Sequence, residues 1–219
     1  MHITVQNLNY IEDHIKSKIN DLSNNKKPKI IAVSKTFNID KILPLIKYGH
    51  IDYGENKVQE AVDKWSLIKA ENKNIKIHLV GKLQTNKVKL ALKVFDYIHS
   101  LDSEKLANKI ADEQIKQNKK VKVFIQINVG REDQKSGIKE EDVLNFYNYC
   151  RDLNLDIIGT MCIPPKDSNP HDYFIEMNKI NTKLNLLHLS MGMSEDYLEA
   201  AQNNATFLRI GSKIFGQRG

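Results

Sequence analysis

Cysteine is scarce in this sequence, and long apolar runs are absent. The 219 residues include only Cys150 and Cys162, too few for a disulfide framework, and no cysteine or histidine spacing suits zinc. No apolar run is long enough to cross a membrane, and the amino terminus lacks an apolar signal region. We therefore expect a cytoplasmic protein with no metal site and no membrane association.

Arginine is also scarce, with four copies, so the formal net charge of +6 comes mainly from lysine. The lysines are spread over nearly every segment, and no stretch combines clustered arginine with interleaved aromatic residues. Nucleic-acid grooves usually have such a cluster, so we expect no nucleic-acid partner. A hydrophobic content of 41% fits one globular domain with a sizeable core, assigned to residues 1–219.

Short apolar runs alternate with segments of helical periodicity along the chain. An amphipathic helix over residues 3–19 precedes the first run. The predicted strands span residues 30–35, 51–54, 75–81, 96–101, 121–129, 156–161, 184–189 and 206–210. The predicted helices include one capped by Asp40 and ended by Gly49, and others over residues 58–70, 87–94, 104–117, 140–153, 172–183 and 195–201.

Strict alternation of strand and helix implies a parallel sheet, and eight such units close into a barrel. An open doubly wound sheet is the alternative, but no Gly-x-Gly-x-x-Gly pattern follows the first strand. The predicted fold is therefore a single (β/α)8 TIM-type barrel with an extra N-terminal helix.

Lys35 stands at the carboxyl end of the first predicted strand, the end at which barrels bind ligands. Partial desolvation lowers the pKa of a lysine in such a place, and the neutral amine can form a Schiff base. Most lysines are solvated surface charges, so position alone leaves both interpretations open.

Two glycine- and serine-containing segments follow the last two predicted strands, where barrels often bind phosphate. Residues 190–194 read Ser-Met-Gly-Met-Ser, and Gly211-Ser212 precedes a short final helix. Glycine lets backbone amides approach an anion and serine adds donors, although the same residues also make ordinary turns. Arg209 lies among apolar neighbours in the last strand and needs an acidic partner or a ligand.

A lysine amine, a phosphate site and a buried arginine together suggest pyridoxal 5'-phosphate. Lys35 would form the aldimine, the two segments would hold the phosphate, and Arg209 would face the pyridine nitrogen.

Several motifs then occur in the order found in one known family. They are Ala32-Val33-Ser34-Lys35-Thr36, Gly54-Glu55-Asn56, His78-Leu79-Val80-Gly81, Lys135-Ser136-Gly137, Ser190-Met191-Gly192-Met193-Ser194 and Arg209-Ile210-Gly211-Ser212. On these motifs the chain resembles the pyridoxal phosphate homeostasis protein family, which is similar to the N-terminal barrel domain of alanine racemase.

The resemblance implies a monomeric barrel that carries the cofactor on Lys35 with little or no turnover. Its role would be vitamin B6 homeostasis, with PLP-dependent apoenzymes as recipients of the cofactor. The implied cofactor-binding residues are Lys35, Asn56, His78, Ser190, Met191, Gly192, Ser194, Arg209, Gly211 and Ser212. Lys57 departs from the family pattern, because tyrosine commonly follows Gly-Glu-Asn.

Two enzymatic alternatives remain open from the sequence. An amino-acid racemase would need a second base, for which Tyr53 and His78 are the nearby candidates, and an arginine at the pyridine nitrogen weakens the electron sink. A cofactor-free Schiff-base aldolase would use Lys35 with Glu55 as acid or base, but it leaves Arg209 unexplained. We assign no catalytic residue.

Overall fold

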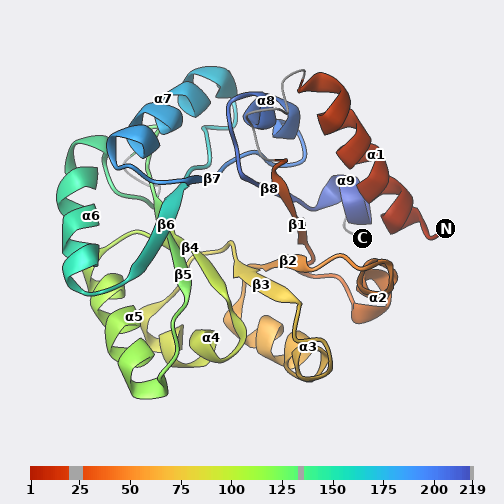
Figure 1. The fold of residues 1–219 in the computed structure, drawn as a ribbon, viewed down its shortest axis with the longest axis horizontal. Coiled ribbons are helices and arrows are strands. Elements are labelled where there is room, and N and C mark those ends of the chain that lie inside the picture. The colour runs from red at the N-terminus through yellow and green to blue at the C-terminus, as the bar shows by residue number, and fades with distance from the viewer. Residues whose placement is uncertain (20–26, 133–135, 218–219) are drawn as a thin grey trace.

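A computed structural model describes residues 1–19, 27–132 and 136–217, and its eight parallel strands form a closed barrel inside a ring of helices (Figure 1). The strands are β1 (Lys29–Val33), β2 (Asp52–Glu55), β3 (Lys76–Leu79), β4 (Tyr97–Leu101), β5 (Lys122–Gln126), β6 (Asp156–Met161), β7 (His188–Ser190) and β8 (Phe207–Ile210). Each strand pairs with its neighbours in sequence, and β8 closes on β1. The predicted (β/α)8 TIM-type barrel is confirmed.

Helices follow the strands and cover the outside of the barrel (Figure 1). They are α1 (Ile3–Lys18), α2 (Ile39–Tyr48), α3 (Val58–Glu71), α4 (Val88–Val94), α5 (Glu104–Gln117), α6 (Val143–Asp152), α7 (Pro170–Lys183), α8 (Tyr197–Gln202) and α9 (Ser212–Phe215), with 3-10 turns η1 (Thr85–Lys87) and η2 (Glu140–Asp142). The expected extra N-terminal helix is α1, which packs against α2, α8 and α9.

One predicted helix cap was wrong and one helix end was right. Helix α2 begins after Asn38, and Asp40 lies in the first turn, where its charge favours the helix dipole without capping the helix. Gly49 ends the helix in the left-handed conformation, with φ 98°, as its position predicted.

The predicted strand over residues 184–189 was displaced. Leu184 is the C-cap of α7, Asn185 turns the chain with φ 53°, and Leu187 is 81% exposed. The apolar residues of this segment therefore belong to a helix end and a loop, and β7 begins only at His188. The shift makes Ser190 the last residue of the strand.

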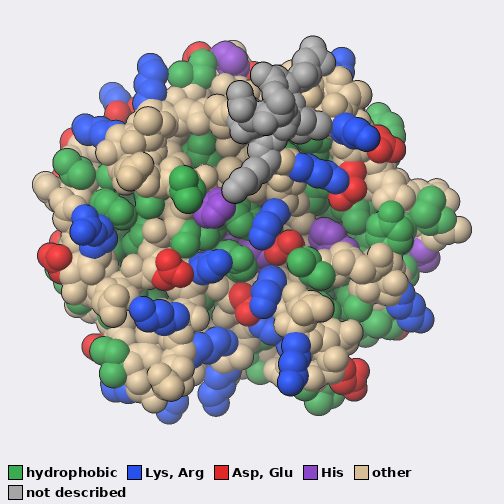
Figure 2. All heavy atoms as spheres, in the orientation of Figure 1, with side chains coloured by type: hydrophobic (Ala, Val, Ile, Leu, Met, Phe, Trp, Pro, Cys, Tyr) green, Lys and Arg blue, Asp and Glu red, His purple; other side chains and the backbone are tan. Residues whose placement is uncertain are grey.

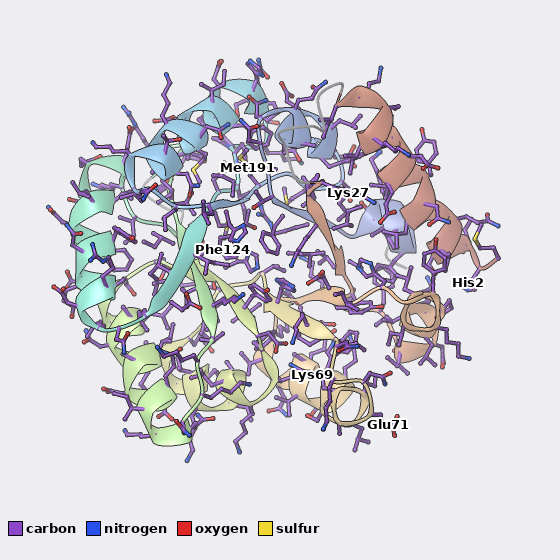
Figure 3. The ribbon with its side chains drawn as sticks, viewed as in Figure 1. His2, Lys27, Lys69, Glu71, Phe124 and Met191 are labelled. Atoms are coloured by element: carbon purple, nitrogen blue, oxygen red, sulfur yellow. The ribbon has the colours of Figure 1, made fainter. Side chains whose placement is uncertain are left out.

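The barrel has two buried layers, because successive strand side chains point to opposite faces of the sheet. The outer layer lies between strands and helices and contains Trp65, which packs on Tyr53 with ring centroids 4.7 Å apart. The inner layer fills the barrel, where Phe124 is drawn in Figure 3, and its buried members are Ile31, Val33, Tyr97, Phe124, Met161 and Phe207.

The surface shown in Figure 2 carries Lys and Arg side chains over many elements, without one dominant basic patch. Within the described ranges, no helix combines the length and the apolar character that a membrane span requires. The same residues contain no group of three or more potential metal ligands. Lys135 of the Lys135-Ser136-Gly137 motif lies outside the described residues.

Candidate functional site

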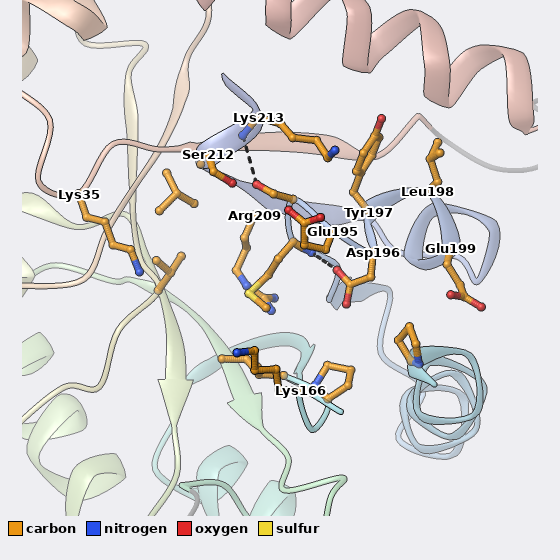
Figure 4. Close-up of a pocket in the computed structure, with 18 of the residues that line it drawn as sticks. Lys35, Lys166, Glu195, Asp196, Tyr197, Leu198, Glu199, Arg209, Ser212 and Lys213 are labelled. Atoms are coloured by element: carbon orange, nitrogen blue, oxygen red, sulfur yellow. Dashed lines mark hydrogen bonds between the residues drawn. The ribbon is translucent and has the colours of Figure 1, made fainter. Parts of the chain in front are cut away.

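A pocket of about 1120 Å³ opens at the carboxyl ends of the strands (Figure 4). Lys35 and Arg209 both extend into it. The residues that line it at or just beyond the strand ends are Val33, Lys35, Val80, Arg209, Gly211 and Ser212. The pocket continues outward past Pro165 and Lys166 to Tyr197 of α8. Two cationic side chains from adjacent strands therefore share one cavity.

The backbone around Lys35 is held on both sides. The Ser34 hydroxyl donates to Glu55 Oε1 over 2.7 Å, and Lys64 donates to the Ser34 carbonyl oxygen over 3.0 Å. The Thr36 amide donates to Glu60 Oε1 over 2.6 Å, and Thr36 has φ 69°. A β-branched residue in the left-handed region is strained, so this tight turn is imposed by its surroundings.

Glu55 lies on the outer face of β2, away from the pocket. Its Oε1 accepts from Trp65 Nε1 over 2.9 Å and from Lys64 Nζ over 3.0 Å, both on α3. The carboxylate is fully buried in that contact. The suggestion that Glu55 acts as acid or base beside Lys35 was therefore wrong, because strand alternation places the two side chains on opposite faces.

Arg209 is buried, and its guanidinium contacts neutral groups. Nη1 donates to Ser190 Oγ and Nη2 to the Cys162 carbonyl oxygen, each over 2.8 Å. Among the described residues, no carboxylate forms an ion pair with it. Burial lowers the pKa of Arg209, and the nearby charge of Asp196 opposes that shift. The acidic-partner interpretation of Arg209 loses its support, and an acceptor on a ligand would satisfy the remaining donors.

The two predicted phosphate segments lie next to one another. The Lys213 amide, in the first turn of α9, is 3.4 Å from Ser194 Oγ. Gly192 has φ 86°, and a Cβ there would lie 2.4 Å from the Ala200 side chain, so glycine is required. Backbone amides and hydroxyls at the start of α9 form a setting suited to an anion.

Nine of the ten predicted residues fall into two groups, and Asn56 lies apart from both. Lys35, Ser194, Arg209, Gly211 and Ser212 line the pocket. The others lie behind its wall: Ser190 beneath Arg209, Gly192 against Ala200, Met191 in the outer core, and His78 inside the barrel.

Asn56 follows β2 and is only partly exposed. Its Oδ1 is buried without a hydrogen-bond partner among the described residues. Gly81 approaches it so closely that a Cβ on Gly81 would lie 2.4 Å from the Asn56 carbonyl oxygen. An unpaired buried acceptor near the strand ends is the kind of group that a ligand donor or a water molecule satisfies.

Several pocket residues were not in the predicted binding set, although all but Lys213 stand in the quoted motifs. Val33, Val80, Met193 and Lys213 also line the cavity. Val33 had a usable signal, because it lies two residues before Lys35 and strand periodicity places both on one face. Met193 and Lys213 reach the pocket through loop geometry, which no sequence period encodes.

The fold and the pocket define a barrel of the alanine racemase N-terminal domain class, whose family model matches residues 7–219. The chain is 38% identical to the pyridoxal phosphate homeostasis protein of Aquifex aeolicus, over 87% of both chains. It is 34% identical to the protein of that name from Pasteurella multocida, over 97% of both. The chain belongs to the pyridoxal phosphate homeostasis protein family.

Solved structures agree with this placement. PipY of Synechococcus elongatus PCC7942, described without PLP, has a TM-score of 0.86 and 28% identity, covering 98% of this chain and 100% of PipY. PipY described with PLP bound has a TM-score of 0.80 and 29% identity, covering 92% and 100%.

Proposed function

We propose that this protein binds pyridoxal 5'-phosphate as a Schiff base on Lys35 and serves intracellular vitamin B6 homeostasis. The observation that carries the proposal is the shared pocket of Lys35 and Arg209, with the Ser194 and Ser212 segments beside it. An amine, a phosphate-sized anion setting and a hydrogen-bond donor for a ring nitrogen match the three functional parts of this cofactor. The name of the relatives and the PLP-bound PipY structure support the same ligand.

The pocket-lining residues of the predicted set then have stated roles. The Lys35 amine forms the covalent link, and the strained turn between Ser34 and Thr36 fixes its direction. Arg209 donates to the pyridine nitrogen. Ser194, Gly211 and Ser212 surround the phosphate. Asn56 does not line the pocket, but its Oδ1, buried without a partner among the described residues, accepts a hydrogen bond from the ligand or from a water molecule.

A carrier role explains the pocket better than a racemase role. A racemase needs a second base facing the cofactor. Tyr53 packs on Trp65 in the outer layer, and burial raises its pKa, so it remains a neutral phenol. His78 is fully buried, and burial lowers its pKa. Neither candidate lines the pocket, and we therefore propose little or no turnover.

The other implied properties are part of the same proposal. Lys57 is exposed and lies in a separate hollow between α2 and α3, so it adds no cation to the Lys35 pocket. The protein acts as a cytoplasmic monomer, and PLP-dependent apoenzymes receive the cofactor from it.

The test is the visible absorption spectrum after incubation with pyridoxal phosphate and desalting. We expect an aldimine band on the wild type and its complete loss in Lys35→Ala. Lys166→Ala is the matched control, because Lys166 is a lysine of the same pocket outside the proposed binding set. Equal bands on all three proteins would mean nonspecific labelling, and no band on the wild type would refute the proposal.

A further inference from the structure

A continuous line of buried polar side chains crosses the barrel interior, from the amino end of β2 to the pocket. Its links are Asp52 Oδ1 to His78 Nε2 at 3.0 Å, His78 Nδ1 to His99 Nε2 at 3.0 Å, His99 Nδ1 to Ser190 Oγ at 2.8 Å, and Ser190 Oγ to Arg209 Nη1 at 2.8 Å. All five residues are buried. Neither Asp52 nor His99 belongs to the predicted binding residues.

Hydrogen-bond chemistry gives this line one direction when the histidines are neutral. A guanidinium only donates, so Ser190 Oγ accepts from Arg209. A carboxylate only accepts, so His78 Nε2 carries a proton toward Asp52, and with neutral rings this leaves His99 Nδ1 to accept the Ser190 hydroxyl proton. His99 Nδ1 is then the acceptor nitrogen, and its Nε2 carries the proton that points at His78.

The same logic continues to the carboxylate. His78 Nδ1 accepts from His99, so the proton of His78 sits on Nε2 and points at Asp52. A carboxylate accepts only, and the line ends there. Every donor therefore points from the Arg209 end toward Asp52, and both histidines are the Nε2–H tautomer.

The surroundings keep the imidazoles neutral. The His78 ring stacks on Tyr97 at 4.2 Å and the His99 ring on Phe124 at 4.3 Å, with Phe207 edge-on to His99. Burial lowers the pKa of His78, which the Asp52 contact opposes, and holds the pKa of His99 well below its usual range. A second positive charge in this layer would lie close to Arg209 and cost free energy.

We propose that Asp52 is a positioning residue for the cofactor site, acting on Arg209 through His78, His99 and Ser190. Aligned hydrogen bonds polarise one another, so the carboxylate charge makes Ser190 Oγ a stronger acceptor for Arg209. Arg209 thereby keeps its orientation and its charge without a carboxylate in direct contact with it among the described residues. The effect on the cofactor rests on the proposed function, whereas the tautomers do not.

The first experiment reads the tautomers directly, by ¹⁵N NMR of the imidazole nitrogens in the cofactor-free protein. We expect His78 and His99 each to show a protonated Nε2 and an unprotonated Nδ1 near neutral pH. An Nδ1–H tautomer at either residue, or an imidazolium at His78, would reverse the direction of the line and overturn the proposal.

The second experiment measures the dissociation constant of pyridoxal phosphate for Asp52→Asn. The amide keeps the shape and an acceptor but removes the charge, and we expect affinity to fall roughly threefold to thirtyfold. Asp156→Asn is the matched control, because Asp156 begins β6 at the same end of the barrel and lies outside the line.

The two experiments separate failures of the two proposals. If the wild type retains the cofactor and both Asn variants bind it equally well, the positioning role is refuted and the proposed function stands. If the wild type retains none, the proposed function fails, and the tautomers alone decide whether the line runs as argued.

Discussion

Lys35 and Arg209 face one pocket but are held in opposite ways. The turn of Lys35 is fixed from outside the barrel, where Glu55 and Lys64 bring full charges against Ser34. The side chain of Arg209 is fixed from inside, by a hydroxyl and a carbonyl oxygen. A directly paired charged network is tolerated where a helix can supply the opposite charge, and neutral links between separated charges are favoured where strands surround the group.

The contacts behind Lys35 and those behind Arg209 should differ most in how much they contribute to the free energy of unfolding. Glu55→Gln leaves Lys64, whose side chain is 10% exposed, with only the 27% exposed carboxylate of Glu60, and we expect a loss of about 3 kcal/mol in the free energy of unfolding. Ser190→Ala removes a neutral link and leaves two polar atoms unpaired, for a loss of about 1–3 kcal/mol. Urea denaturation at neutral pH measures both.

A surface pair serves as the control for that comparison. Glu12 accepts from Lys27 at 3.0 Å, and the two side chains are 36% and 54% exposed. Glu12→Gln should cost less than about 1 kcal/mol, because solvent screens exposed pairs. The contacts among Glu55, Glu60, Lys64 and Ser34 form the outer network. Equal losses for Glu12→Gln and Glu55→Gln would contradict the claim that burial strengthens this network.

The buried line from Asp52 to Arg209 is the inner line. As pH falls, its contribution to the free energy of unfolding should be lost before that of the outer network. In the folded protein the pKa values of His78 and His99 lie below the usual 6.5, mainly because of burial, so the fold loses stability as pH falls below 6.5. Each histidine contributes a slope of up to about 1.4 kcal/mol per pH unit. Burial raises the pKa of Glu60, but bonds from Thr36 and Lys64 lower it overall, so its contribution is lost only below 4.5.

Denaturation of the wild type and His99→Asn between pH 7 and pH 5 checks this order. The variant should be less stable at pH 7 but should lose less stability on acidification. A parallel loss in both proteins would show that His99 is not a source of the acid sensitivity.

The smallest expected effect concerns the strained turn. Thr36→Asn relieves the strain of a left-handed conformation, which asparagine tolerates. We expect the free energy of unfolding to rise by about 0.5–1 kcal/mol. Because the Glu60 contact involves the backbone amide, it survives the change. A thermal melt measures the gain, and a loss of stability would mean that the threonine side chain makes a contact worth more than the strain.

The barrel was predictable because its signal is repeated along the chain. Helix α5 and strand β6 matched the predicted bounds, since capping residues and turns flank clear periodic segments. The β7 boundary failed because Leu184 and Leu187 have strand-like composition but serve a helix end and an exposed loop. Apolar residues predict burial on average, but they do not say whether a residue lies in a strand, a helix end or a loop. In this segment the turn at Asn185 decides that.

The pocket was predictable where chemistry follows a strand end, as with Lys35 and Arg209. The inner line was not, because Asp52, His78 and His99 meet only through the register of β2, β3 and β4. His99 reaches Ser190 of β7 only across the closed barrel. One signal was available: Tyr97 and His99 are two residues apart in β4, so both point to the same face. Which residue would face His99 from another strand is set by the register.

Trp65 gives the protein a built-in optical probe. It is the single tryptophan of the chain, it is fully buried, and its indole nitrogen is fixed on the carboxylate that also holds the Ser34 hydroxyl. Excited indole can transfer energy to a nearby chromophore that absorbs where indole emits, and the aldimine proposed for Lys35 would be such a chromophore. Quenching of this one fluorophore would report loading of the pocket in real time, without any attached label.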